Sequence, residues 1–322
     1  MSKVEGPFLV IPTARGTLPQ LTPDQAREIF AEEERLMGMT VFEATQWTAV
    51  CKEADRSFAQ LAGAGEFKLL LTCRNVLQGA HPSAPSSDKG IAADLEKGRL
   101  VVSPKDWCNV VSSLRPTHAV PLHDSIALGD PSAKKRRTML TRSDAFLKEI
   151  TASKESQSVT LVQDIGEYLL QGENISEFAR NCMALPVGGL YYAGARSLAE
   201  YIVCLTAGFA FVEWSLPWSL AADGIALNLT LNKPSAEPVF IDLNDDHFTF
   251  DIQPLSEGCA CFTCRSHHRA YIHHLLTVQE MNSEILLSIH NVHTANILAR
   301  AFRQCETKEK RVQQGEALLQ ML

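Results

Sequence analysis

The sequence has no apolar run long enough to cross a membrane. Its most apolar run, residues 201–212, has twelve residues, whereas a transmembrane helix needs about 20. The first seven residues also lack the basic start and the long apolar segment of a secretory signal. We therefore predict no membrane insertion, and we expect residues 201–212 to form a buried helix followed by a buried strand.

Basic residues are not in excess either. Thirty Lys and Arg stand against 37 Asp and Glu, which gives a net charge of −7. This balance argues against a wide basic surface that coats nucleic acid, while a local basic patch stays open. With 45% hydrophobic and 21% charged residues, the composition excludes wholesale disorder.

The cysteines do not form a disulfide framework. They are nine, an odd number, and their spacing is irregular, unlike the cysteines of small secreted domains. We expect reduced thiols and a cytoplasmic protein. Association with the mitochondrial outer surface and a nuclear location both stay open.

Short apolar runs alternate with helical segments. A chain of 322 residues suits one large domain or two ordinary ones. Runs without polar alternation are typical of strands buried on both faces of a parallel sheet, and their alternation with helices predicts βαβ units. A barrel and a doubly wound sheet both satisfy this pattern. The runs are residues 67–71, 100–102, 119–122, 159–162, 189–192, 209–212 and 239–241.

Other segments are predicted from local signals. Residues 8–12 suit a strand, and Thr22 is the expected N-cap of a helix that begins with Pro23. We expect further helices at 45–62 and 308–322 from their apolar spacing.

Three cysteines lie close together in the segment 258–264. Cys259, Cys261 and Cys264 have C-x-C-x-x-C spacing, which lets one tight turn direct three sulfurs at a single point. Zn²⁺ is commonly held by four tetrahedral sulfur and nitrogen ligands. The segment therefore predicts a zinc site that needs one more ligand. The other six cysteines are expected to be ordinary buried side chains.

Histidines supply the candidates for the fourth ligand. A helix expected over residues 269–277 would carry His273 and His274 away from the turn. His290, at the end of a second helix expected over 280–289, can fold back onto the turn. This geometry favours His290 and leaves the others open. The candidates are His267, His268, His273, His274, His290 and His293.

This region resembles the zinc region of the tRNA-guanine transglycosylases. The resemblance rests on the cysteine motif, on Arg-Ala-Tyr-Ile-His-His-Leu at 269–275 and on the pair His290-Asn291. A second block, residues 192–217, is similar to the family's stretch that ends in a strand bearing the nucleophile. The resemblance covers about residues 8–303 and is specific over roughly 190–295.

The resemblance implies a TIM (β/α)8-type barrel with an inserted zinc-binding subdomain. We expect a single domain over residues 1–322, with the zinc subdomain at about 245–295 and a helical C-terminal end. The resemblance also implies that one structural Zn²⁺ ion is held by four ligands, which are Cys259, Cys261, Cys264 and His290.

The family's reaction exchanges a base in tRNA. One aspartate attacks the ribose and expels guanine, and a second acts on the incoming 7-deazaguanine base. In eukaryotes this base is queuine, the exchange is at the tRNA wobble position, and the enzyme is a heterodimer of a catalytic subunit and a divergent, non-catalytic homologue.

The position of the family's nucleophile differs in this chain. Glu213 stands where the family has its aspartate, with Trp214 in place of the next cysteine, and Trp218 and Ser219 replace a threonine and an arginine. Displacing an attacking oxygen by about 1 Å can cost on the order of 100-fold in rate. The family's Asp-Ser-Gly-Gly-Phe-Gln string is absent, and Asp124 is only a loose match to another base-recognising aspartate.

We therefore expect a non-catalytic subunit that pairs with a catalytic transglycosylase and helps to hold tRNA. The helix at 269–276 suits the subunit contact, because Tyr and Arg are enriched at interface cores; packing inside the zinc subdomain is the alternative. The basic run 134–137 reads as a solvated loop or a phosphate contact. Further RNA candidates are Arg303, Lys308, Lys310 and Arg311.

Two rival interpretations remain. In the first, the chain is an active tRNA-guanine transglycosylase that uses Glu213 as its nucleophile. In the second, it is a zinc-binding adaptor unrelated to RNA modification, and the resemblance over residues 190–295 is chance.

Overall fold

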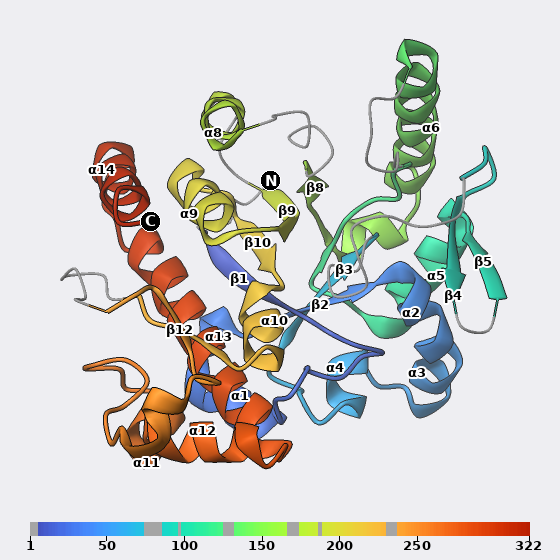
Figure 1. The fold of residues 1–322 in the computed structure, drawn as a ribbon. Coiled ribbons are helices and arrows are strands. Elements are labelled where there is room, and N and C mark those ends of the chain that lie inside the picture. Colours follow the sequence, from blue (N-terminus) through green and yellow to red (C-terminus); the bar gives the residue numbers. More distant parts are fainter. Residues whose placement is uncertain are drawn as a thin grey trace.

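A computed structural model describes residues 6–73, 86–95, 98–124, 132–165, 174–185, 189–229 and 237–322. Within them, eight parallel strands form one sheet in the order β7-β6-β3-β2-β1-β10-β9-β8 (Figure 1). The strands are β1 (Phe8–Pro12), β2 (Leu36–Thr40), β3 (Lys68–Thr72), β6 (His118–Ala119), β7 (Thr160–Leu161), β8 (Gln163–Asp164), β9 (Leu190–Ala195) and β10 (Phe211–Trp214).

The sheet closes on itself through β7 and β8. Only Val162 separates these two strands, so one passage of the chain pairs with β6 through β7 and with β9 through β8. The Val162 amide donates to the Ala119 carbonyl on one side, and the Gln163 amide donates to the Gly189 carbonyl on the other. The predicted TIM-like parallel barrel is confirmed. Two of its eight strands share one passage, so the described ring has seven passages of the chain.

Helices cover the outside of the barrel (Figure 1). The first is capped as predicted, because Thr22 and Gln25 form a capping box and Pro23 opens the helix. The α-helices are α1 (Pro23–Ile29), α2 (Val41–Ala44), α3 (Thr48–Ala54), α4 (Phe58–Leu61), α5 (Pro104–Leu114), α6 (Ala133–Thr151), α8 (Ile175–Ala184), α9 (Leu198–Ala207), α10 (Leu216–Ala222), α11 (Phe262–Ser266), α12 (Arg269–Thr277), α13 (Asn282–Arg303) and α14 (Lys308–Leu319).

Two antiparallel strand pairs lie outside the barrel. They are β4 (Ile91–Leu95) with β5 (Gly98–Val102), and β11 (Ile225–Leu227) with β12 (Phe240–Asp242). Short 3-10 helices complete the described chain: η1 (Glu32–Glu34), η2 (Thr45–Trp47), η4 (Glu155–Ser158) and η5 (Asp246–Phe250). The apolar runs at 100–102 and 239–241 thus form strands, but these strands do not belong to the barrel.

The buried apolar residues form two clusters. The larger one fills the barrel and the space under its helices. The smaller one is formed by residues of α10, β12, η5, α12 and the first half of α13, among others. It includes Leu243, Ile272 and Leu287, each with 0% exposure. The region around the three cysteines therefore has an apolar core of its own.

Three expected elements differ from the structure. The helix expected at 45–62 is broken into η2, α3 and α4, because Asp55 takes a left-handed conformation with φ of 47°. The basic run 134–137 is not a loop: it lies at the start of α6, where the Ser132 side chain accepts from the Lys135 amide. The helix expected at 280–289 continues to Arg303, so His290 lies inside α13 and not at its end.

Within the described ranges, we find no helix that combines the length and the apolar character needed to span a bilayer.

Candidate metal centre and barrel-mouth carboxylate

A tight turn presents the three cysteines. Gly258 enters the turn with φ of 74°, a conformation that favours glycine. Cys261 is the N-cap of α11, and its sulfur accepts a hydrogen bond from the Cys264 amide at 3.3 Å. The Thr263 hydroxyl donates to the Leu286 carbonyl at 2.7 Å, which fixes α11 against α13.

α13 brings the fourth candidate to the same point. The Nδ1 atom of His290 lies 3.7 Å from the sulfur of Cys259, 3.6 Å from that of Cys261 and 3.3 Å from that of Cys264. All four possible ligand atoms lie within 4.8 Å of one another. Tetrahedral zinc with Zn–S of about 2.3 Å and Zn–N of about 2.0 Å requires N···S separations of about 3.6 Å. The four residues therefore fit a zinc ion.

The orientation of the His290 ring supports this fit. Its Nε2 atom lies 3.1 Å from the Leu227 carbonyl, which can only accept a hydrogen bond. The proton is therefore on Nε2, and the Nδ1 lone pair points at the three sulfurs. Asn291 binds the strand that contains Leu227, β11, and also α10. Its Oδ1 accepts from the Leu227 amide at 2.8 Å, and its Nδ2 donates to the Ile225 carbonyl of β11 and to the Pro217 carbonyl of α10.

Close contacts within the cluster shift the pKa values of Cys259, Cys261 and His290. Hydrogen bonds from Cys261 and Cys264 lower the pKa of the Cys259 thiol, while hydrogen bonding to Cys259 and Cys264 raises the pKa of Cys261. Burial would lower the pKa of His290, but hydrogen bonds to Cys259 and Cys264 raise it to about 9. Three thiolates at this spacing repel one another, and a dication at their centre removes the repulsion.

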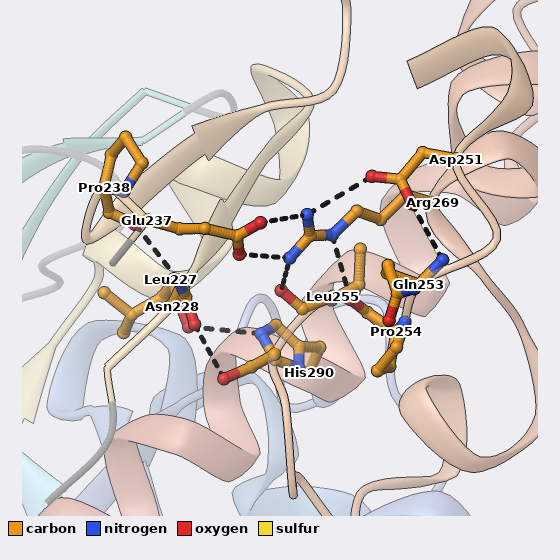
Figure 2. Close-up of polar contacts among 11 residues, drawn as sticks. Leu227, Asn228, Glu237, Pro238, Asp251, Gln253, Pro254, Leu255, Arg269 and His290 are labelled. Atoms are coloured by element: carbon orange, nitrogen blue, oxygen red, sulfur yellow. Dashed lines mark hydrogen bonds and ion pairs between the residues drawn. The ribbon is translucent and has the colours of Figure 1, made fainter. Parts of the chain in front are cut away.

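Arg269 lies among the segments that contain Glu237, Asp251 and Leu255 (Figure 2). Its guanidinium, only 4% exposed, pairs with Glu237 at 2.5 Å and Asp251 at 3.3 Å. It also donates to the carbonyls of Pro254 at 2.9 Å and Leu255 at 3.2 Å. Arg269 thus ties three segments together, which agrees with the predicted alternative of packing inside the zinc subdomain.

The two faces of α12 differ. Arg269, Ile272 and His273 are buried, so the packing interpretation holds for that face. Tyr271 is 38% exposed, and its ring stacks on that of His267 with centroids 5.0 Å apart. His267 in turn makes an edge contact with Phe262, which is 41% exposed. We call Phe262, His267 and Tyr271 the aromatic row.

Glu213 lies near the C-terminal end of β10, inside the barrel mouth. It is 2% exposed, and the Tyr191 hydroxyl of the neighbouring strand donates a hydrogen bond to it. A Cβ at Gly38 would lie 3.6 Å from the Glu213 carboxylate, an ordinary van der Waals contact, so Gly38 of β2 packs directly beside the glutamate. The longer carboxylate is thus packed and capped by its neighbours.

The surroundings of Glu213 favour its neutral form. Burial raises its pKa most, the Tyr191 hydrogen bond lowers it, and the nearby carboxylates of Asp164 and Glu43 raise it further, to about 8. At neutral pH the carboxyl is mostly protonated, and a protonated carboxyl is a poor nucleophile.

The other positions around the mouth also carry structural contacts. Trp214 is fully buried and stacks on Tyr201 with ring centroids 4.2 Å apart. The Trp218 indole donates to the Pro19 carbonyl at 3.1 Å, while Ser219 is exposed. Asp124 is buried and forms an ion pair with Arg142 of α6.

The basic RNA candidates divide into two groups. Arg303 pairs with buried Glu34 and donates to the Pro7 carbonyl at 3.1 Å, so its contacts in this structure are within the fold. Arg311 packs over Gly208. Lys308 and Lys310 are exposed at the start of α14. The run 134–137 is mostly exposed at the start of α6.

Comparisons with known proteins agree with this architecture. Residues 181–314 match the family model described as queuine tRNA-ribosyltransferase. The chain is similar to proteins named queuine tRNA-ribosyltransferase accessory subunit 2. The one from Drosophila persimilis is 24% identical over 347 residues, which cover 92% of this chain and 82% of the relative. The one from Schizosaccharomyces pombe is 24% identical, covering 92% and 74%, and the one from Danio rerio is 22% identical, covering 95% and 90%. Residues 181–314 are thus similar to the queuine tRNA-ribosyltransferase family, and the chain as a whole is similar to proteins named queuine tRNA-ribosyltransferase accessory subunit 2.

Proposed function

We propose that this chain is the non-catalytic accessory subunit of a heterodimeric queuine tRNA-ribosyltransferase. It would support the exchange of guanine for queuine at the tRNA wobble position by pairing with the catalytic subunit and by binding tRNA. The observation that carries the proposal is the state of Glu213, which is buried and capped by Tyr191. The chain has the barrel, but Glu213, at the position of the family's nucleophile, is buried and contacts its neighbours.

The proposed metal is one structural Zn²⁺ ion, held by Cys259, Cys261, Cys264 and His290. Four protein ligands fill a tetrahedral zinc site and leave no position for a reactive water. When bound, the ion supplies folding energy to the segment around the turn. The proposed subdomain at about 245–295 is supported by the smaller apolar cluster, which is distinct from the barrel core.

We place the contact with the catalytic subunit on the exposed face of α12, where the aromatic row lies. Exposed aromatic side chains are rare on monomers and are enriched at interface cores. Val278 at 50% and Met281 at 82% exposure extend the apolar surface beyond the end of α12. We expect the heterodimer to act in the cytoplasm; the mitochondrial outer surface and the nucleus are further compartments to examine.

The alternative function is an active transglycosylase that uses Glu213 as its nucleophile. A base-exchange assay with labelled guanine separates the two, using the chain alone, the catalytic partner alone and the pair. The assays of the chain alone and of the pair are repeated with Glu213→Gln, which keeps the size of the side chain.

We expect no exchange by the chain alone, and exchange by the pair that is unchanged by Glu213→Gln. Exchange by the chain alone that Glu213→Gln abolishes would establish the alternative. A chain that neither exchanges the base alone nor captures a transglycosylase partner in a pull-down would favour the unrelated zinc adaptor.

A further inference from the structure

The first half of α6 stands clear of the barrel (Figure 1). The helix is anchored by its second half, where Phe146 is 3% exposed and Ile150 is fully buried. Arg142, one turn before that anchor, pairs with Asp88 at 3.0 Å and with Asp124. Residues 132–141 are exposed or half-exposed throughout. The first half of α6 is therefore a rigid arm whose sides face solvent.

The start of this arm is basic in every direction. Four consecutive cations, Lys134 to Arg137, occupy about one helical turn, and at about 100° per residue they point to four sides of the axis. Within the described part of the chain, Lys134, Lys135 and Arg137 form no ion pair, whereas Arg142 is fully engaged by carboxylates. We call Lys134, Lys135 and Arg137 the α6 cations.

Helix physics disfavours cations at this place. The N-terminus of a helix carries a partial positive charge and is stabilised by acidic residues. The first turn of α6 contains no acidic residue, and the first one in the helix is Asp144. The α6 cations thus add repulsion to an exposed helix start in a protein whose net charge is −7. An extended anionic ligand that runs along the helix start would offset this repulsion, because each cation could then lie near a negative charge.

The geometry points to the phosphate backbone of tRNA as that ligand: we infer that the α6 cations form a phosphate-binding surface of this subunit. The inference rests on the proposed function, which supplies the RNA. Between Ser132 and Arg142 the helix offers no aromatic, Asn or Gln side chain, so it has no aromatic ring to stack on a base and no amide to read an adenine edge. The surface therefore positions the RNA through its backbone and does not select a sequence.

The test measures tRNA affinity of the reconstituted heterodimer as a function of salt concentration. The variant is the triple substitution Lys134→Gln, Lys135→Gln and Arg137→Gln. A charge-conserving variant, Lys134→Arg with Lys135→Arg, is the first control. A second control, Lys308→Gln with Lys310→Gln, removes two exposed cations from the start of α14, where both side chains lie far along the chain from α6.

Each lost phosphate contact lowers the slope of log affinity against log salt by about 0.7–0.9. The triple variant is expected to lose about two to three in slope and about 100-fold in affinity at 0.1 M salt. Its midpoint of thermal unfolding should stay the same or rise, because the helix start loses its repulsion. The Arg variant should bind like the parent chain.

Three results would overturn the inference. One is a triple variant with unchanged slope and affinity, and another is a loss of slope only in the α14 control, which would place the surface there. The third is a triple variant that keeps tRNA affinity but no longer binds vesicles with anionic lipid, which would make α6 a membrane contact. Base exchange by the pair at saturating tRNA, measured alongside, shows whether the proposed function itself holds.

Discussion

The buried carboxylate of Glu34 offers the sharpest test of how this fold is held together. Glu34 is 1% exposed and lies at the end of η1. It accepts hydrogen bonds from Arg300 at 2.7 and 2.5 Å, from the Asn296 amide at 2.8 Å and from the Ala31 backbone at 3.0 Å, and it also pairs with Arg303. One carboxylate thus joins the last turns of α13 to the N-terminal part of the barrel.

The magnitude follows from the pKa of Glu34. Burial would raise this pKa, but hydrogen bonds from Arg300, Asn296, Ala31 and Arg303 outweigh it and lower the pKa from 4.5 to about 2. At about 1.4 kcal/mol per pKa unit, the ionised form stabilises the fold by about 3 kcal/mol. Because the folded pKa lies below the unfolded one, this stability is fully present above about pH 5. It is lost as the pH falls from about 4.5 towards 2.

The perturbation is Glu34→Gln, measured by urea unfolding of parent and variant at equal zinc loading. We expect a loss of about 3 kcal/mol at pH 7, and a difference between the two proteins that shrinks steadily below pH 4.5. The quantity compared is the difference in unfolding free energy between parent and variant. Acid also acts on the proposed metal site, but it does so in both proteins, so this effect cancels in the difference.

The control is Glu306→Gln. Glu306 is 77% exposed and pairs with Lys310 one turn away, so its loss should change the unfolding free energy by less than about 0.5 kcal/mol. A Glu34→Gln variant within 1 kcal/mol of the parent at pH 7, or a difference that does not depend on pH, would refute the reasoning.

Three further predictions concern packing and the metal centre. Gly315→Ala should destabilise the fold by about 1–3 kcal/mol, since its Cβ would meet the Thr206 hydroxyl at 2.1 Å; urea unfolding measures this, and Thr206→Ala in the same chain should restore much of the loss. Arg269→Ala should cost about 1–3 kcal/mol, because it leaves the Pro254 and Leu255 carbonyls without their donor, and unchanged urea unfolding would contradict the role assigned to Arg269. Cys261→Ala should abolish zinc binding, measured by elemental analysis, and dissociate the heterodimer in size-exclusion chromatography; a metal-free pair that stays intact would show that the ion does not support the interface.

Much of the barrel could be predicted because its strands are short apolar runs buried on both faces. β2 was not predicted, since Gly38 and Thr40 interrupt its apolar pattern and its burial depends on neighbours far along the chain. The closure of the ring could not be predicted either. It depends on which partners stand beside Val162, and no local property of residues 160–164 reveals them.

The candidate site was predictable to the extent that it is local. Three sulfurs within one turn are visible in the sequence, whereas the fourth ligand comes from 26 residues beyond Cys264. Geometry alone only favoured His290, because the Leu227 carbonyl that orients its ring lies on a distant strand. Likewise, the glutamate at 213 could be read directly, but its neutral state depends on burial and on Tyr191.

One helix connects these features physically. α13 carries His290 in its first half and Arg300 and Arg303 in its last turn. The same helix therefore contributes to the proposed zinc site and to the hydrogen bonds around Glu34. A helix in a packed interior shifts as a unit and not by bending freely. A change in the turn that contains Cys259, Cys261 and Cys264 should therefore alter the contact of Arg300 and Arg303 with Glu34. A change in that contact should likewise alter the position of His290. We expect metal binding at the proposed site and barrel stability to be coupled through α13, in which case a double-mutant cycle of Cys261→Ala and Glu34→Gln shows a non-additive loss of unfolding free energy; additive losses would contradict this coupling.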